Sequence, residues 1–170
     1  PRRKQAFRRS SRWPSNLGVV VLDTLLVRLA FPTTAVGVAL LAEQHGWGLF
    51  HVLTMPVWLS VVAAVILLDL AIYFQHVLFH AVPALWRLHR VHHADLDFDV
   101  TTGLRFHTFE ILISAGIKIF IVMLLGPSAV AVVVFEVLLN ATAMFNHANV
   151  RMPLWLDKML RGIVVTPDMH

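Results

Sequence analysis

Four long apolar stretches, separated by polar segments, run through the chain at residues 17–42, 52–75, 111–125 and 129–145. About 20 apolar residues cross the hydrocarbon core of a bilayer as a helix, so the first two stretches are long enough to span it. The other two are shorter and flank a Gly-Pro-Ser turn at residues 126–128. The pattern predicts an all-α membrane protein with four hydrophobic helices, arranged as two hairpins.

Lysines and arginines are distributed unevenly around these stretches. Six precede the first stretch, three lie between the second and third, three follow the fourth, and the two short turns contain none. Because basic residues beside membrane spans mark the cytoplasmic side, the histidine-rich segment 76–110 is predicted to form a cytoplasmic helical cap. We therefore expect a basic cytoplasmic arm at residues 1–16 and a single membrane-embedded domain at residues 17–170.

The composition excludes a disordered chain and an ordinary soluble domain. Of 170 residues, 58% are hydrophobic and 14% are charged, against about 25% charged residues in soluble globular domains. The absence of cysteine excludes disulfides and thiolate metal sites, and leaves ten histidines as the main candidate ligands. The net charge of +4 arises from the N-terminal arm, for which attraction to anionic lipid head groups is favoured over nucleic-acid binding.

Five histidines lie within eighteen residues, directly after the second apolar stretch. His76 and His80 are one helical turn apart, and the pattern H-x-x-H-H places His89, His92 and His93 on one face of a following helix. A single histidine in a core usually makes a hydrogen bond, but five at this spacing are typical of a metal site. The sequence therefore predicts metal binding by these five side chains.

Further candidate ligands come from more distant parts of the chain. The two-hairpin arrangement returns His147 and His170 to the cytoplasmic face, and either His107 or Glu110 could coordinate a metal or orient a ligand. Seven or more imidazoles exceed the needs of one ion, so a pair of ions is expected. Imidazole suits iron, zinc, copper and nickel alike. We favour two irons, because a redox-active site at the lipid boundary can use dioxygen on a membrane substrate.

The spacing of these histidines resembles the fatty acid hydroxylase and sterol desaturase superfamily of integral membrane di-iron oxygenases. The superfamily pattern H-x(3,4)-H, followed by H-x(2,3)-H-H, matches the pair at His76 and His80 and the trio that begins at His89. The superfamily has a third histidine motif near the C-terminus, H-x-x-H-H. Here the residues Thr166-Pro167-Asp168-Met169-His170 resemble the segment that leads into this motif, with His170 as its first histidine. The resemblance implies that x-x-H-H follows, so we expect the domain to be incomplete at its C-terminus and the fragment alone to be inactive.

The resemblance also implies a reaction. It is the oxygen-dependent hydroxylation or desaturation of a membrane lipid, such as a fatty acyl chain or a sterol, at a histidine-ligated di-iron centre with O2 as co-substrate. The chain has no glycine-rich nucleotide motif, so electrons are expected from a separate reductase or electron carrier. A carotenoid or alkane hydroxylase is an alternative within the class. The competing hypothesis is a histidine-rich protein that binds or transports metal without redox chemistry, although transport would need ligands at midspan.

Several polar residues are expected to orient the ligands. Asp69 and Tyr73 share a helical face with the first histidine pair, and Glu110 and Asn149 are assigned the same supporting role. A second reading of Asp69 is an intramembrane pair with Arg28, which lies at a similar depth.

Two further groups are predicted to be structural. Lys118 and Glu136 are each nine residues from Pro127, so antiparallel helices would place them at equal depth as an ion pair. Three aspartates alternate after the histidine trio: Asp95, Asp97 and Asp99. They lack the spacing and glycine of an EF-hand, so helix capping and contact with a nearby arginine are favoured over calcium. His45 and His51 fall at the opposite face and are expected to lie outside the site.

Overall fold

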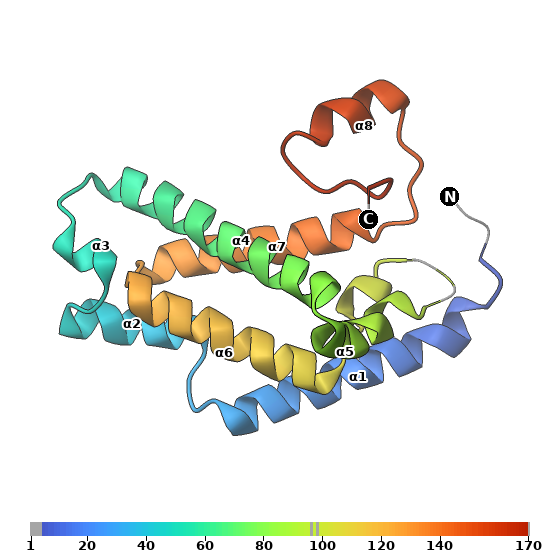
Figure 1. Ribbon diagram of the computed structural model, residues 1–170, viewed down its shortest axis with the longest axis horizontal. Helices are drawn as coiled ribbons and strands as arrows, with labels where there is room; N and C mark the ends of the chain where they lie inside the picture. Colours follow the sequence, from blue (N-terminus) through green and yellow to red (C-terminus); the bar gives the residue numbers. More distant parts are fainter. Residues whose placement is uncertain (1–4, 96, 98, 170) are drawn as a thin grey trace.

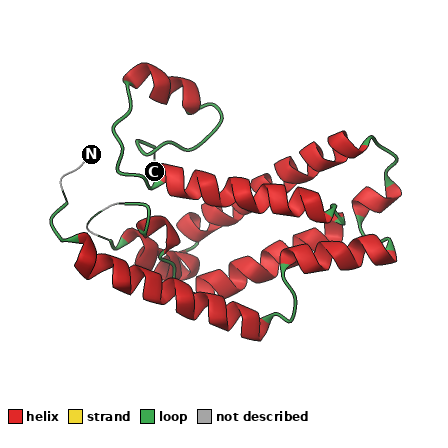
Figure 2. Ribbon diagram, turned by 180° about the vertical axis from the view of Figure 1, so that it is seen from behind, coloured by secondary structure: helices red, strands yellow, loops and turns green. Residues whose placement is uncertain are grey.

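The computed structural model describes residues 5–95, 97 and 99–169. Within these residues every regular element is a helix and there is no strand (Figures 1 and 2). The elements are α1 (Arg9–Ala30), α2 (Ala35–His45), α3 (Leu49–Val52), α4 (Val57–Ala81), α5 (Pro83–His93), the 3-10 turn η1 (Thr102–Leu104), α6 (Thr108–Leu125), α7 (Ala129–Asn146) and α8 (Leu154–Leu160). Four segments are long and apolar enough to cross a membrane: Arg9–Val52, Val57–Ala81, Thr108–Leu125 and Ala129–Asn146. The predicted all-α class with four hydrophobic helices is confirmed.

The first hydrophobic segment differs from the single stretch expected at residues 17–42. Its helix α1 already begins at Arg9, and the helical structure is interrupted between α1 and α2. Pro32 lies in the break and has no N–H to continue the helical ladder. The Thr34 hydroxyl then accepts a hydrogen bond from the Gly37 N–H at 3.2 Å, which starts α2 anew. The apolar stretch is therefore two helices joined at a proline.

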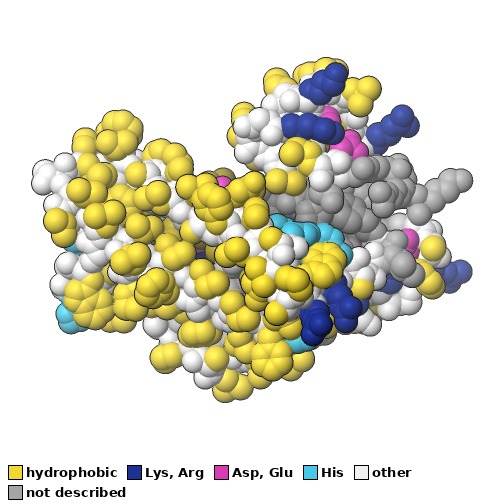
Figure 3. All heavy atoms as spheres, in the orientation of Figure 1, with side chains coloured by type: hydrophobic (Ala, Val, Ile, Leu, Met, Phe, Trp, Pro, Cys, Tyr) yellow, Lys and Arg dark blue, Asp and Glu magenta, His cyan; other side chains and the backbone are white. Residues whose placement is uncertain are grey.

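The helices pack around a small apolar core. α2 and α4 each contact both α6 and α7. The most deeply buried side chains at these contacts are Ala39, Leu68, Val122, Val132 and Phe135. The outer faces of the same helices are covered with apolar side chains, while charged groups gather at the end that carries α5 and α8 (Figure 3). An apolar exterior over a small core is the pattern of a multi-pass membrane protein.

The turn between α2 and α4 meets the turn between α6 and α7 at one end of the molecule, and α5 lies toward the other end (Figure 1). Gly48 and Gly126 have φ angles of 92° and 61°. A Cβ on Gly126 would lie 2.0 Å from the Trp47 carbonyl oxygen, and one on Gly48 would lie 2.3 Å from the Gly126 nitrogen. Only glycine fits at either position. His45 and His51 belong to this end, away from the histidines of α5.

Candidate metal centre

The histidine-bearing end of α4 joins α5 through one tight connection. α4 continues six residues beyond the apolar stretch expected from the sequence, so His76 and His80 lie on its last two turns. Val82 is extended, with φ −92° and ψ 120°, and Pro83 opens α5 at once. A residue before proline disfavours helix, whereas proline is favoured in a first helical turn. The sequence Val82-Pro83 therefore ends α4 and brings α5 back against it.

Four imidazoles form a continuous cluster at this junction, called here the four-histidine group: His76, His80, His89 and His93. Successive Nε2 atoms are 3.2 Å apart for His76 and His80, 3.2 Å for His80 and His89, and 3.1 Å for His89 and His93. Imidazole nitrogens bound to one metal ion lie about 2.1 Å from it, which separates neighbouring donors by roughly 3.0 to 3.4 Å. The observed spacing fits donors that share an ion. Candidate ligand atoms of His76, His80 and His89 all lie within 4.8 Å of one another.

A second imidazole pair lies beside this group. His147 at the C-terminal end of α7 places its Nε2 2.8 Å from the Nε2 of His92, which is 55 residues away in the chain. Both rings are buried, with exposed fractions of 3% and 1%. The His92 ring centroid lies 5.0 Å from that of His93, which connects the pair to the four-histidine group. Six imidazoles from α4, α5 and the end of α7 thus converge.

The outer nitrogens of the His92–His147 pair fix where its hydrogens lie. His92 Nδ1 is 3.2 Å from the Arg105 carbonyl oxygen, and His147 Nδ1 is 2.6 Å from the Ala143 carbonyl oxygen. Because a carbonyl only accepts, each Nδ1 carries a hydrogen, so in a neutral ring the Nε2 presents a lone pair. Two lone pairs facing each other at 2.8 Å repel unless a cation binds them.

A metal ion fits this requirement better than a proton. Burial lowers the pKa of His147, and repulsion from His89 lowers it further, against the opposing effect of the hydrogen bond to Ala143. The neutral ring is therefore favoured, and neutral imidazole is the form that binds metal.

Glu110 orients His89 as the two backbone carbonyls orient His92 and His147. Its Oε1 accepts a hydrogen bond from His89 Nδ1 at 2.7 Å, and both side chains are buried. The Nε2 lone pair of His89 is then directed at His80 and His93. A carboxylate in this position fixes the ring of a ligand histidine and raises its basicity. The other oxygen of Glu110, Oε2, is buried and has no hydrogen-bond partner among the described residues.

Aromatic rings cover the centre. Phe106 stacks on His92 with ring centroids 4.5 Å apart and planes 2° from parallel. The Trp86 ring lies 5.4 Å from His80 and 5.5 Å from His93. Desolvation inside the cluster, followed by repulsion from His89 and the other imidazoles, lowers the pKa of His93 to about 4. Its ring is therefore neutral at physiological pH.

A comparison with known families identifies the domain that carries these histidines. The family model described as "Fatty acid hydroxylase" matches residues 61–170, which is more than half of the chain and includes all six converging histidines. The chain belongs to the fatty acid hydroxylase family. The resemblance drawn from the histidine spacing is thereby confirmed. No curated protein and no solved structure matches the chain.

Other predicted residues of the fatty acid hydroxylase domain lie in different settings. His107 is the N-cap of α6, and its Nδ1 accepts a backbone N–H at 3.2 Å. Among the described residues, no hydrogen bond or ring contact joins His107 to the six histidines. Asp69 and Tyr73 are exposed on α4, and none of the hydrogen bonds in the described chain links either to a histidine. Asn149 is half-buried beyond α7. His170 lies outside the described residues.

Sequence reasoning missed the groups that orient the His92–His147 pair. The carbonyls of Arg105 and Ala143 are backbone groups, so the identity of the side chain carries no signal. Gly103 lets η1 lie against His147, since an added Cβ would lie 2.9 Å from the His147 Nδ1. The glycine is the available signal, because a close backbone approach favours it.

Proposed function

We propose that the protein is an oxygen-dependent lipid hydroxylase or desaturase that works at a histidine-ligated di-iron centre. The observation that carries the proposal is the convergence of six imidazoles, with successive Nε2 atoms 3.1 to 3.2 Å apart in the four-histidine group and 2.8 Å apart in the His92–His147 pair. Membership of the fatty acid hydroxylase family supports a lipid substrate and an oxidative reaction.

The two irons would divide the imidazoles between them. The four-histidine group would hold one ion and the His92–His147 pair would hold the other, with His170 as a further ligand. Imidazole donors suit iron. When bound, the iron pair supplies the activation of dioxygen and the removal of hydrogen from an unactivated C–H bond.

The chain's own groups prepare these ligands. Glu110 keeps a hydrogen on His89 Nδ1, and the carbonyls of Arg105 and Ala143 do the same for the His92–His147 pair. Each of these rings therefore turns an Nε2 lone pair toward the centre. Phe106 stacks on the buried His92, and Trp86 packs against His80 on the exposed side of the four-histidine group.

A membrane lipid would reach the centre from the bilayer. The spans present apolar faces to their surroundings (Figure 3), and the six histidines lie at the ends of α4 and α7 and along α5. An acyl chain or sterol can extend its apolar part along such a surface while one carbon approaches the ligands. A carotenoid or an alkane is the alternative substrate. The distribution of basic residues supports a cytoplasmic position for the centre.

Metal transport without redox chemistry is a weaker candidate. A transporter needs polar ligands near midspan that open to each side in turn. The converging histidines belong instead to α5 and to the adjoining ends of α4 and α7. α5 lies away from the turns that contain Gly48 and Gly126 (Figure 1). This position favours chemistry at the membrane boundary.

A separate electron donor would dock on the exposed side of α5. Arg87 and Arg90 are exposed there, next to Trp86, whose ring contacts two histidines of the four-histidine group. A donor protein with an acidic surface fits this charge. Arg151, which is exposed in the segment between α7 and α8, adds a further positive charge on the predicted cytoplasmic side. Arg87→Gln and Arg151→Gln are expected to reduce donor-supported turnover without loss of metal, and unchanged turnover at low ionic strength would remove this docking surface.

The main test uses the protein expressed from its full reading frame and purified in detergent. We expect about two irons per chain, and loss of iron in His80→Ala and His89→Ala. His45→Ala, at the opposite end, is the matched control and should keep its iron. With dioxygen, a reduced electron carrier and membrane lipid, the product should be a hydroxylated or unsaturated lipid. Iron-loaded protein that oxidises no lipid, or wild-type protein that binds no iron, would overturn the proposal.

A further inference from the structure

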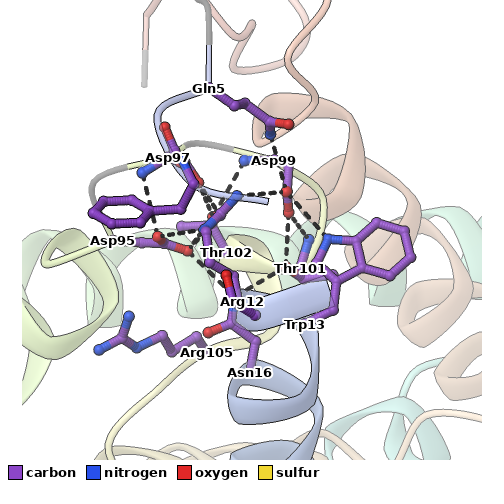
Figure 4. A network of polar contacts seen from close by, with 12 residues as sticks. Gln5, Arg12, Trp13, Asn16, Asp95, Asp97, Asp99, Thr101, Thr102 and Arg105 are labelled. Atoms are coloured by element: carbon purple, nitrogen blue, oxygen red, sulfur yellow. Dashed lines mark hydrogen bonds and ion pairs between the residues drawn. The ribbon is translucent and has the colours of Figure 1, made fainter. Parts of the chain in front are cut away.

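A buried polar network joins the start of α1 to the loop that follows the histidine trio (Figure 4). Its centre is Arg12, whose guanidinium donates to the two carboxylate oxygens of Asp95 at 2.9 and 3.2 Å. It also donates to Asp99 Oδ2 at 3.0 Å and to the backbone carbonyl of Asp97. Trp13 Nε1 donates to the same Asp99 oxygen at 3.2 Å. The predicted contact of the aspartates with an arginine is confirmed, but the arginine is not a sequence neighbour: Arg12 lies 83 residues from Asp95, in the N-terminal arm.

Hydroxyl and amide groups complete the network. Thr102 Oγ1 donates to Asp95 Oδ2 at 2.9 Å, and Thr101 Oγ1 donates to Asp99 Oδ1 at 2.7 Å. Asn16 of α1 donates to Thr101 Oγ1 at 2.9 Å. Asn16, Thr101 and Thr102 are at most 5% exposed. A buried network in which these polar groups find partners holds one conformation, so the loop is fixed on α1.

The same loop makes two contacts with the His92–His147 pair. Gly103, directly after Thr102, lies against His147, where an added Cβ would be 2.9 Å from Nδ1. The carbonyl of Arg105 accepts the hydrogen bond from His92 Nδ1 at 3.2 Å. Because only a few residues separate these contacts from the network, a shift of the loop would move both imidazoles.

We propose that Arg12 is a positioning residue of the metal centre. By holding Asp95, Asp97 and residues 99–105 on α1, it sets Gly103 and the Arg105 carbonyl so that His92 and His147 face the same ion. The inference rests on the proposed metal-binding function. Arg12 acts through the loop, since its guanidinium donates hydrogen bonds to the aspartates of that loop. Arginine suits this place because its planar fork binds one carboxylate through two bonds and still has donors for another.

The network should affect the two metal positions unequally. The four-histidine group belongs to α4 and α5, and its buried anchor is Glu110 of α6. None of these elements contributes a side chain to the hydrogen bonds of Arg12. Loss of Arg12 is therefore expected to weaken the ion at the His92–His147 pair and to spare the other ion.

Cobalt(II) titration of the metal-free protein tests this difference. The protein is expressed from its full reading frame, and binding is followed by visible absorption of the bound cobalt. Wild-type protein should bind about two cobalt ions. Arg12→Gln should keep one ion at wild-type affinity and bind the second about 10- to 100-fold more weakly, as is usual when a group supporting a ligand is lost. Arg12→Lys, which keeps the charge but lacks the fork, should be intermediate.

Two further variants separate positioning from folding. Arg8→Gln removes an exposed arginine of the same arm and should bind both ions as the wild type does. Gly103→Ala leaves the network in place but crowds His147, and should weaken the same second ion. Thermal unfolding is measured in parallel, and the unfolding midpoint of each variant should lie well above the temperature of the titration.

The outcomes are distinguishable. The inference would be overturned if Arg12→Gln bound both ions at wild-type affinity, or if it lost both equally. Wild-type protein that binds no cobalt would overturn the proposed function itself.

Discussion

Lys118 of α6 donates a hydrogen bond to Glu136 of α7, with Nζ and Oε1 2.6 Å apart. The pair expected from their equal distance to the turn at Pro127 is confirmed. Charged groups within apolar helices are costly unless they find a partner. Arg28 and Asp69, for which a similar pairing was considered, are both exposed, and no ion pair joins them in the described part of the chain. Equal depth therefore predicted a partner only where helices also bring the side chains together.

Removing one member of the Lys118–Glu136 pair is expected to destabilise the protein. Lys118→Met leaves a carboxylate without its cation, and Glu136→Gln leaves the ammonium without its anion. Each should lower the free energy of unfolding by about 1 to 3 kcal/mol. The double variant carries neither charge and should be more stable than either single variant. Thermal midpoints in detergent measure this, and losses that simply add in the double variant would contradict pairing.

Gly126 is expected to tolerate substitution less well than Gly46, the other turn glycine with a similar φ angle. Gly126→Ala combines a φ of 61° with a Cβ only 2.0 Å from a carbonyl oxygen, so we expect a loss of more than about 2 kcal/mol. Gly46→Ala has a similar φ of 66° but open space, and should cost about 1 to 2 kcal/mol.

Gly18→Ala is the control for these two variants, because it lies within α1 with nothing near its Cβ. It should leave stability unchanged or raise it by up to about 1 kcal/mol. Thermal midpoints give the order directly. Equal losses at Gly46 and Gly126 would mean that the two turns do not touch.

The features that could be predicted from the sequence depend on local spacing. Helical periodicity placed His76 and His80 together and grouped the histidines of α5, since residues three and four apart share a face. The ends of the helices were harder to predict from the sequence. α4 extends to Ala81 because nothing in its backbone stops it before Pro83, although its side chains become polar earlier. Pro32, in contrast, interrupts an apolar stretch for which hydropathy alone predicts one continuous helix.

The features that could not be predicted depend on contacts between distant residues. His147 was a candidate of second rank, because only the folded chain brings it to His92. An arginine partner for the aspartates was expected, but spacing could not identify Arg12, which is 83 residues from Asp95. The basic arm was interpreted as a lipid-binding segment, and this buried ion pair shows that one of its arginines is part of the fold instead.

His107 and His147 are expected to respond oppositely to substitution. His147→Ala removes a buried Nε2 from the His92–His147 pair and should cost at least one bound iron per chain, measured by elemental analysis. His107→Asn should keep both the iron and the stability, because asparagine is a strong N-cap. His107→Ala removes the cap and should lower stability by about 1 kcal/mol with no loss of iron. Loss of iron in His107→Asn would show that His107 is a ligand.

Acid is expected to release the Arg12 network. Burial raises the pKa of Asp99, but hydrogen bonds from Thr101 and Trp13 and the charge of Arg12 outweigh it, so the pKa lies below the ordinary 3.8. A carboxyl group with a depressed pKa stabilises the folded state above its unfolded pKa, and this contribution is lost as the pH falls through the folded value. The advantage of wild type over Asp99→Asn should therefore be constant above about pH 5 and shrink below about pH 4. Thermal midpoints of both proteins, measured from above pH 5 to below pH 4, test this expectation. An advantage of the wild type that grows in acid would contradict a depressed pKa of Asp99.

The C-terminal segment is closed by a hydrogen bond from Thr166 Oγ1 to Asp157 Oδ1 at 2.6 Å. Both side chains are at most 1% exposed, and Arg161 donates to the other oxygen of Asp157 at 2.7 Å. Thr166→Val keeps the shape of the side chain and removes the donor, which should cost about 1 to 3 kcal/mol. Local opening of this loop then becomes more frequent, so trypsin should cleave after Arg161 several-fold faster than in the wild type.

Thr142→Val is the matched control, because that hydroxyl donates only to carbonyls of its own helix α7. It should leave the rate of cleavage after Arg161 unchanged, since α7 does not depend on the closure of the C-terminal loop. Equal acceleration in both variants would mean general loosening of the protein. Acceleration in Thr166→Val alone would show that the buried hydrogen bond holds the segment through which the chain approaches His170.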